Sequence, residues 1–263
     1  MPPLLFVGAV AFAAAGLSFF SGFGLGTVLL PVFALFFPAE VAVAATAVVH
    51  AVNGFLKVLM VGSHAAPSVV LRFGLPSVLA AFVGASALDY VSHFGVLATY
   101  SLGSRTAVIT PLKVFLSGAM FVFALFELLP RLRELRFDRK HLVLGGVLSG
   151  FFGGFSGHQG ALRSAFLTKV EGSTEAFVGT TAVISLMVDV TRIATYTAAF
   201  LPSDGVGPIH ADGWNLVLAA VVGSSCGILL ARHFLAAITM QTVRALTGFL
   251  LLGIAAALGT GVI

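Results

Sequence analysis

The chain has 263 residues, of which 59% are hydrophobic and only 9% are charged, against about 25% charged residues in ordinary soluble domains. Its mean hydropathy is +1.08, so most of its surface must face something other than water, which excludes an ordinary soluble domain. The formal net charge of +4 is small, and it does not indicate a nucleic-acid partner. Cys226 is the only cysteine, which excludes an internal disulfide and a cysteine-rich metal site. We expect no metal and no cofactor.

Long apolar segments recur along the whole chain. No charged side chain precedes Glu40, and the apolar runs have the length that a helix needs to span a bilayer. A membrane β-barrel would instead show alternating segments of about ten residues. The first run, residues 3–20, lacks the basic start of a signal peptide, so we expect it to belong to the mature fold. The pattern predicts an all-α polytopic membrane protein.

In chain order, the first half is predicted to begin with a helical hairpin over residues 1–37, broken at SGFGLG (21–26) before a helix at 27–37. Three crossings follow at about 39–63, 70–90 and 106–129. The link RLRELRFDRK (131–140) then holds five Lys or Arg residues and two acids. The second half is predicted to begin with a hairpin over 141–168, broken at GGFSGHQG (153–160) before a helix at 161–168. Its three crossings are expected at about 174–200, 214–231 and 240–261.

The two halves resemble each other. EVAVAATAVVHAVNGFLK (40–57) aligns with EAFVGTTAVISLMVDVTR (175–192) at a constant offset of 135, which places Lys57 on Arg192. LAAFVGAS (79–86) also matches LAAVVGSS (218–225) at six of eight positions. The order of these matches predicts two structural repeats, residues 1–130 and 141–263, joined by the link 131–140. Because each repeat contains an odd number of crossings, the repeats are predicted to be inverted relative to each other.

The charged segments predict the topology. By the positive-inside rule the link 131–140 is cytoplasmic, whereas LPSDGVGPIHADG (201–213) has two Asp and no Lys or Arg and is placed outside. The turn near 232–244 carries Arg232, His233 and Arg244, which suits the inside. Residues 141–168 then begin and end on the cytoplasmic side, so they form a re-entrant hairpin. We expect a multi-pass protein of the cytoplasmic (inner) membrane, with both termini outside.

Polar and basic residues gather at the two breaks and in the helices that follow them. Backbone at membrane depth is tolerated where it lines a cavity, and the N-terminus of the next half-helix offers free N–H groups to an anion. A charge buried in a membrane is expensive, so its default interpretation is functional or paired. The candidate substrate-binding residues are Gly22, Gly24, Gly26, His50, Asn53, Lys57, Ser156, Gly157, His158, Gln159, Arg163 and Arg192, and Asp189 is a candidate for coupling.

Structural interpretations of these residues stay open. Lys57 lies near enough to the membrane edge to extend toward water. Arg192 has the i,i+3 spacing to pair with Asp189, and His50 has the alternative of a hydrogen-bonded role in helix packing. The glycines of the first break, Gly22, Gly24 and Gly26, have the alternative role of close helix packing.

At the glycine breaks the sequence resembles the TauE/SafE family of sulfite exporters and sulfonate permeases. SGFGLGTVLLPVFALFFPAEVAVAATAVV looks like the glycine-rich start of that family, with Pro31 after its glycines, and GVLSGFFGGFSGHQGALRSAFL repeats the theme. The second repeat departs from the family pattern in its four polar residues between 156 and 163 and in Ser164, which stands where a proline is usual. The resemblance implies transport of sulfite or another sulfur-containing anion, often outward. The expected partners are therefore a small anionic solute and the lipid bilayer, and a homodimer is compatible with the sequence.

The sequence also has features that bear on functions other than transport of a sulfur anion. Gly154-Phe155-Ser156-Gly157 spells the G-x-S-G motif of rhomboid intramembrane proteases, whose serine needs a histidine base within hydrogen-bond reach. The downstream histidines, His210 and His233, fall in predicted loops, and the chain has no H-E-x-x-H motif of a metalloprotease. We expect no enzyme. A channel or carrier for another solute, and a scaffold or sensor, remain as alternatives.

Overall fold

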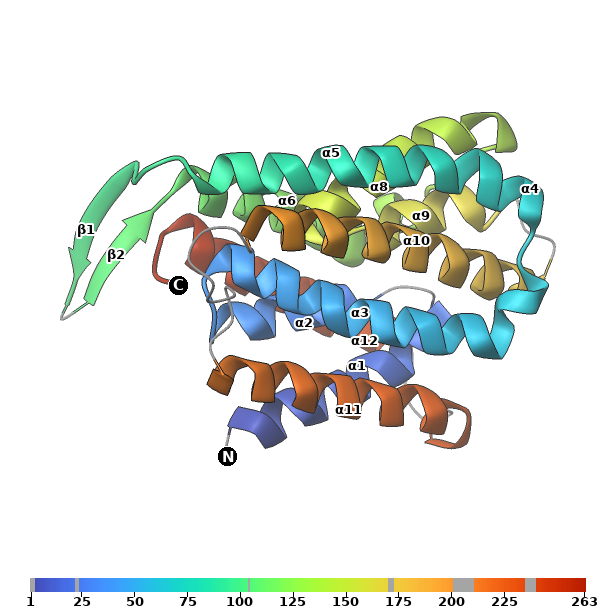
Figure 1. The fold of residues 1–263 in the computed structure, drawn as a ribbon, viewed down its shortest axis with the longest axis horizontal. Coiled ribbons are helices and arrows are strands. Elements are labelled where there is room, and N and C mark those ends of the chain that lie inside the picture. The colour runs from blue at the N-terminus through green and yellow to red at the C-terminus, as the bar shows by residue number, and fades with distance from the viewer. Residues whose placement is uncertain (1–2, 22–23, 104, 170–172, 201–210, 235–239) are drawn as a thin grey trace.

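The computed structural model describes residues 3–21, 24–103, 105–169, 173–200, 211–234 and 240–263 (Figure 1). The first half of the chain contains two helices separated by a glycine-rich break, two long helical segments, a β-hairpin and a further helix. Its main elements are α1 (Pro3–Ser21), α2 (Leu25–Ala34), α3 (Ala39–Val61), α4 (Pro67–Val69), α5 (Leu75–Ser92), β1 (Ala98–Leu102), β2 (Arg105–Ile109) and α6 (Pro111–Leu128). A 3-10 turn (Gly62–His64) precedes α4, and a π-helical segment (Val70–Gly74) joins α4 to α5.

The second half has a similar order of helices. Its elements are α7 (Pro130–Arg133), a 3-10 turn (Arg139–His141), α8 (Leu142–Ser156), α9 (Gly160–Leu167), α10 (Thr174–Phe200), α11 (Ala211–Phe234) and α12 (Met240–Gly259). Five helical segments of the described chain are long and apolar enough to cross a membrane: Ala39–His64, Pro67–Ser92, Pro111–Leu128, Thr174–Ala199 and Gly213–Leu230. The prediction of an all-α, multi-pass membrane protein is therefore confirmed at the level of fold class.

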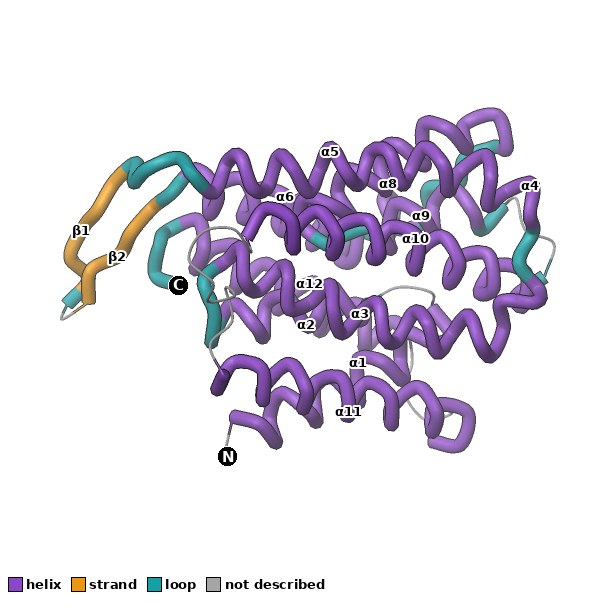
Figure 2. Tube along the Cα trace, viewed as in Figure 1, coloured by secondary structure: helices purple, strands orange, loops and turns teal. Residues whose placement is uncertain are grey.

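The helix surfaces match that environment. Leu79 of α5 is 71% exposed and Phe249 of α12 is 66% exposed. A continuous surface of such large apolar side chains would be unfavourable in water. Lipid removes that cost, because its acyl chains are as apolar as the side chains. Figure 2 shows helices filling the body of the molecule, with most loops gathered at its two ends.

The two ends of the molecule carry different segments. The termini and the β1–β2 hairpin lie at one end, which we call the terminal end (Figure 1). Residues 62–67 and 130–141 lie at the opposite end, which we call the basic end. There Arg139 Nη2 donates to Ser68 Oγ at 3.1 Å, so the charged link contacts the turn that precedes α5.

Helix packing relies on glycines. A Cβ atom added to Gly150 of α8 would lie 2.2 Å from the Ser77 carbonyl oxygen of α5, and one added to Gly154 would lie 2.0 Å from that of Ala81. Gly223 of α11 meets the backbone of α1 at Gly8 in the same way. Only glycine permits this close approach of two helix backbones. Part of the GGFSGHQG motif is therefore a packing seam.

Most helix boundaries lie within a few residues of the predicted ones, and the main exception is the start of α6. The crossing predicted to begin near residue 106 begins at Pro111, because residues 105–109 form β2, which pairs antiparallel with β1. This part of the prediction was wrong. Thr, Val and Ile favour a strand here, Gly103 supplies a positive φ of 62° at the turn, and Pro111 suits the first turn of a helix. Val108 N donates to the Gly261 carbonyl at 2.9 Å, which ties the hairpin to the C-terminal residues.

Candidate functional site

The two glycine breaks lie against each other. A Cβ atom on Gly26, in the first turn of α2, would lie 3.4 Å from the carbonyl oxygen of Gly157 and 3.5 Å from Cδ2 of His50. Gly157 follows the end of α8 with a φ of 77°, a left-handed conformation that favours glycine. A Cβ atom there would lie 2.9 Å from Nη1 of Arg192. The breaks therefore meet beside a histidine of α3 and an arginine of α10.

A buried acid joins these two helices. Nδ1 of His50 lies 2.6 Å from Oδ2 of Asp189. Arg192 Nε donates to Oδ1 of the same carboxylate at 2.9 Å, and its Nη2 atom lies 2.8 Å from that oxygen. Asp189 and Arg192 are both completely buried. The i,i+3 pairing of Asp189 with Arg192, one of the alternatives left open by the sequence, is therefore present.

The network continues into the second break. Gln159 Nε2 donates to Asp189 Oδ1 at 3.2 Å, and Arg163 Nη1 donates to Gln159 Oε1 at 3.3 Å. Arg192 Nη1 also donates to the Gly153 carbonyl at 3.4 Å. All of these side chains are buried, and Nε of Arg163 has no hydrogen-bond partner among the described atoms. A buried donor without a partner is costly, so this cluster retains unused capacity for an acceptor.

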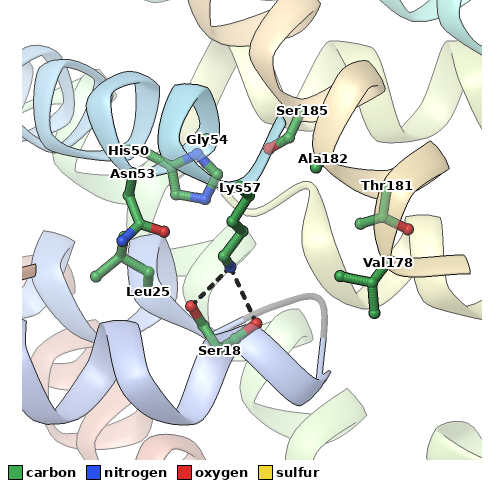
Figure 3. A pocket seen from close by; sticks show the side chains of 10 residues that line it. All are labelled: Ser18, Leu25, His50, Asn53, Gly54, Lys57, Val178, Thr181, Ala182 and Ser185. Atoms are coloured by element: carbon green, nitrogen blue, oxygen red, sulfur yellow. Dashed lines mark hydrogen bonds between the residues drawn. The ribbon is translucent and has the colours of Figure 1, made fainter. Parts of the chain in front are cut away.

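A small pocket opens next to this network, between α1, α2, α3 and α10 (Figure 3). Lys57 reaches across it, and its Nζ atom donates to both the carbonyl and the hydroxyl oxygen of Ser18 at 3.0 Å. The volume available to a water-sized sphere is about 20 Å³, which is room for about one water molecule. The pocket is lined by Ser18, Leu25, His50, Asn53, Gly54, Lys57, Val178, Thr181, Ala182 and Ser185.

The structure divides the predicted site residues into three groups. His50, Asn53 and Lys57 line the pocket. Gln159, Arg163, Asp189 and Arg192 form the buried network behind it, together with the close approaches at Gly26 and Gly157. Gly24, Ser156 and His158 are not among the pocket-lining residues, and Gly22 lies outside the described residues.

Three polar pocket-lining residues were not predicted. Ser18, Thr181 and Ser185 are hydroxyl residues in otherwise apolar helices. Thr181 belongs to a Thr-Ala-Val sequence that recurs in both halves, at 46–48 and 181–183. That match predicts the repeat but no role for Thr181 in a site. Ser18 lies in the last turn of α1, and no pattern in the sequence places it opposite Lys57. The contact depends on how α1 packs against α3.

The protease alternative receives little support from the geometry of Ser156. Nδ1 of His158 does lie 3.2 Å from the Ser156 hydroxyl oxygen. However, that hydroxyl donates its proton to the Phe152 carbonyl at 3.1 Å, so His158 acts toward it as a donor and not as a base. The His158 ring is stacked on Phe123 at 5.2 Å, and its Nε2 atom has no partner among the described atoms, so no carboxylate orients it there. Of the two downstream histidines, His233 lies within α11 and not in the predicted loop, and His210 is outside the described residues.

The cluster is electropositive. Arg192 contacts Asp189 directly, Arg163 reaches it through Gln159, and Lys57 lies across the adjoining pocket, so three basic side chains gather near one carboxylate. Charges in an apolar interior need compensation, and an anion in the adjoining pocket would supply it. At the basic end, by contrast, Asp138 is exposed and contacts Lys169, whose hydrogen bond and charge lower the pKa of that carboxyl.

Comparisons with known proteins agree with the composition and the fold. The model of the family described as "Sulfite exporter TauE/SafE" matches residues 7–258, which is nearly the whole chain. The match includes both glycine breaks and every residue of the pocket. No curated protein and no solved structure matches the chain.

Proposed function

Because the chain belongs to the TauE/SafE sulfite exporter family, which indicates membrane transport of sulfur-containing anions, we propose that it is a secondary transporter or facilitator that exports sulfite or a related sulfur oxyanion. The observation that carries the proposal is the pocket beside the first glycine break, where Lys57 and His50 face a cavity next to a buried network with more bases than acids. Such intramembrane charges mark solute pathways in transporters.

The substrate would replace contacts that the protein now makes with itself. An oxyanion accepts hydrogen bonds from Lys57 Nζ, from the His50 ring and from the Asn53 amide, all of which line the pocket. Leu25 begins α2 at the pocket wall, and the first N–H groups of a helix have no partner within it. Sulfite has four non-hydrogen atoms and does not fit a volume of about 20 Å³. Binding therefore requires Lys57 to leave Ser18 and the pocket to widen.

We also propose that the chain consists of two inverted repeats, residues 1–130 and 141–263, joined by the cytoplasmic link 131–140. Corresponding helix boundaries support this. The end of α1 and the end of α8, the start of α2 and the start of α9, and the start of α3 and the start of α10 are each separated by 135 positions. The packing is reciprocal as well, since α1 packs along α11 while α5 packs along α8. Inverted repeats with discontinuous helices at the substrate site are common in transporters.

Each repeat would begin with a re-entrant hairpin. The two ends of the α8–α9 hairpin lie together, because Phe137 N donates to the Ala165 carbonyl at 3.0 Å and Lys169 contacts Asp138. The chain therefore enters and leaves this hairpin at the basic end. The cluster of basic residues places that end in the cytoplasm by the positive-inside rule, which would place both termini outside in the inner membrane.

Export fits the electrical driving force. An inside-negative membrane potential favours the exit of an anion by about 2.3 kcal/mol per charge per 100 mV, so a facilitator is sufficient. Asp189, which is buried between His50 and Arg192, is the candidate for any coupling to protons.

Flux into proteoliposomes tests the proposal. Purified full-length protein is reconstituted, and sulfite, thiosulfate, sulfate, methanesulfonate and chloride are compared in vesicles with and without protein. We expect protein-dependent, saturable flux of at least one sulfur oxyanion that responds to the sign of an imposed potential. Flux of chloride alone, or no protein-dependent flux of any sulfur anion, would contradict the proposal.

A further inference from the structure

The two repeat-related cations make the same kind of contact. Lys57 Nζ donates to the carbonyl of Ser18 at 3.0 Å, and Arg192 Nη1 donates to the carbonyl of Gly153 at 3.4 Å. The cations are 135 positions apart, and so are the carbonyls. Each carbonyl lies in the last turn of a broken helix, α1 or α8, where the negative end of the helix dipole attracts a cation. The Gly153 carbonyl also accepts a hydrogen bond from Gly157 N at 3.1 Å.

The surroundings of these two contacts differ. Around Lys57 there is a pocket, whose wall includes Thr181 and Ala182. The residues 135 positions away from these two are Thr46 and Ala47, which lie toward the terminal end of α3. All four residues are buried, so the difference between the two sides lies in the cations. Arg192 is completely buried, whereas Lys57 is only partly buried. A cavity that is open on the Lys57 side is therefore closed at the corresponding position on the Arg192 side.

Two side chains fill the closed position. Gly153 has almost no free space, because a Cβ atom on it would lie 3.0 Å from Cγ1 of Val188 and 3.1 Å from Cβ of Gln159. Gln159 is held there by its hydrogen bonds with Asp189 and Arg163. Its counterpart in the first repeat is Gly24, where a Cβ atom would meet nothing within 4 Å. Both residues immediately precede the half-helix that follows the break.

His50 and Ser185 connect the two positions. They are 135 residues apart, so each is the counterpart of the other, and both already line the pocket. A second pocket built from the counterparts would share this pair of residues with the first. An anion bound at His50 and Ser185 would then be within reach of both pockets.

We propose that the protein has a second substrate pocket, related to the first by the repeat, which Gln159 fills together with Val188 in this structure and which opens toward the terminal end. The inference rests on the proposed transport function, since the anion passes from one pocket to the other through His50 and Ser185. In the second state Gln159 leaves Gly153, Arg192 becomes accessible, and the pocket around Lys57 closes.

Thiol labelling from each side of the membrane tests this. Thr181→Cys and Thr46→Cys are matched positions, and each is placed in a chain in which the exposed Cys226 is changed to serine. The reagent is an anionic, membrane-impermeant methanethiosulfonate. We expect Thr181→Cys to react from the basic end and Thr46→Cys to react at least tenfold more slowly, from the terminal end.

Two substitutions of Gln159 distinguish the effect of its side-chain volume from the effect of its hydrogen bonds. Gln159→Gly should raise the labelling rate of Thr46→Cys at least tenfold, whereas Gln159→Met, which fills the space without hydrogen bonding, should leave it protected. A monodisperse elution profile for each variant shows that it is folded, and Gln159→Ala replaces the glycine variant if that one is not.

Two results would overturn the second pocket: protection of Thr46→Cys in the folded glycine or alanine variant, or labelling of both cysteines from the same side. Sulfite flux by the parent protein is measured in the same vesicles. Labelling as expected without any flux would refute the transport function while the second pocket stands.

Discussion

His50 Nδ1 lies 2.6 Å from Oδ2 of Asp189, and this contact joins α3 to α10 where the two glycine breaks meet. The same carboxylate is paired with Arg192. Asp189 therefore holds together one residue that faces the pocket and one that faces the second break. Its position makes the charge balance of the site sensitive to single substitutions.

Arg192→Gln should destabilise the protein more than Lys57→Gln. The first change leaves Asp189 completely buried without its guanidinium partner, and breaking a buried ion pair typically costs about 3–5 kcal/mol. Lys57 is partly buried, and its hydrogen-bond partner among the described residues is Ser18, so its loss should cost about 1 kcal/mol. Thermal unfolding in detergent measures both, and a larger loss for Lys57→Gln would contradict the assigned pairing.

Asp189→Asn should partly restore the Arg192→Gln variant. The second substitution removes the uncompensated charge while the asparagine side chain keeps an oxygen and a donor near His50. A double-mutant cycle on the unfolding temperature should therefore show a favourable coupling energy. Additive losses would mean that the two side chains do not interact as their 2.8 Å separation indicates.

Ser156→Ala should slow sulfite flux by less than tenfold. The hydroxyl donates to Phe152 within its own helix, and one such hydrogen bond contributes about 0.5–1.5 kcal/mol. A fluorophosphonate probe should leave the parent protein unlabelled. Covalent labelling that disappears in Ser156→Ala would instead revive the protease alternative.

Gly150→Ala should destabilise the protein, although alanine is the better helix former. A Cβ atom at this position would lie 2.2 Å from the Ser77 carbonyl, so α5 and α8 must separate, at a cost of about 1–3 kcal/mol. Gly118→Ala in α6 is the control, because nothing lies within 4 Å of its added Cβ atom. Equal unfolding temperatures for the two variants would show that the α5–α8 seam is not tightly packed.

Much of the fold was predictable from the sequence, because apolar length and glycine position determine it. The breaks after Ser21 and Ser156, and the starts of α3 and α10, lie within a few residues of their predicted places. The β1–β2 hairpin was missed, since its apolar residues also suit the start of a helix and only pairing between the strands decides between the two structures.

The site was only partly predictable. The free-energy cost of a charge within the membrane marks residues such as Lys57 and Arg192 as candidates for a site. It does not predict which residues they contact. Ser18 and Gln159 obtain their roles from three-dimensional packing, one opposite Lys57 and the other against Gly153. Neither role has a periodicity or motif that a single sequence reveals.

Reporter fusions test the proposed topology. With two inverted repeats and re-entrant hairpins, a periplasmic reporter should be active at both termini, and a cytoplasmic reporter should be active when inserted in the link 131–140. The reason is that the termini and the link lie at opposite ends of the molecule (Figure 1). An N-terminus located inside would contradict the hairpin proposed for residues 1–37.

Sulfite flux in proteoliposomes that contain either Lys57→Gln or Lys113→Gln tests the central proposal most directly. Both lysines donate to a backbone carbonyl, but Lys113 lies on α6 and contacts Val108 of β2, outside the pocket. Since a charge-assisted hydrogen bond to an anion contributes about 1.5–3 kcal/mol, Lys57→Gln should raise the sulfite KM at least tenfold, with Lys113→Gln within twofold of the parent. Unchanged sulfite flux and KM in Lys57→Gln would contradict an anion site in this pocket.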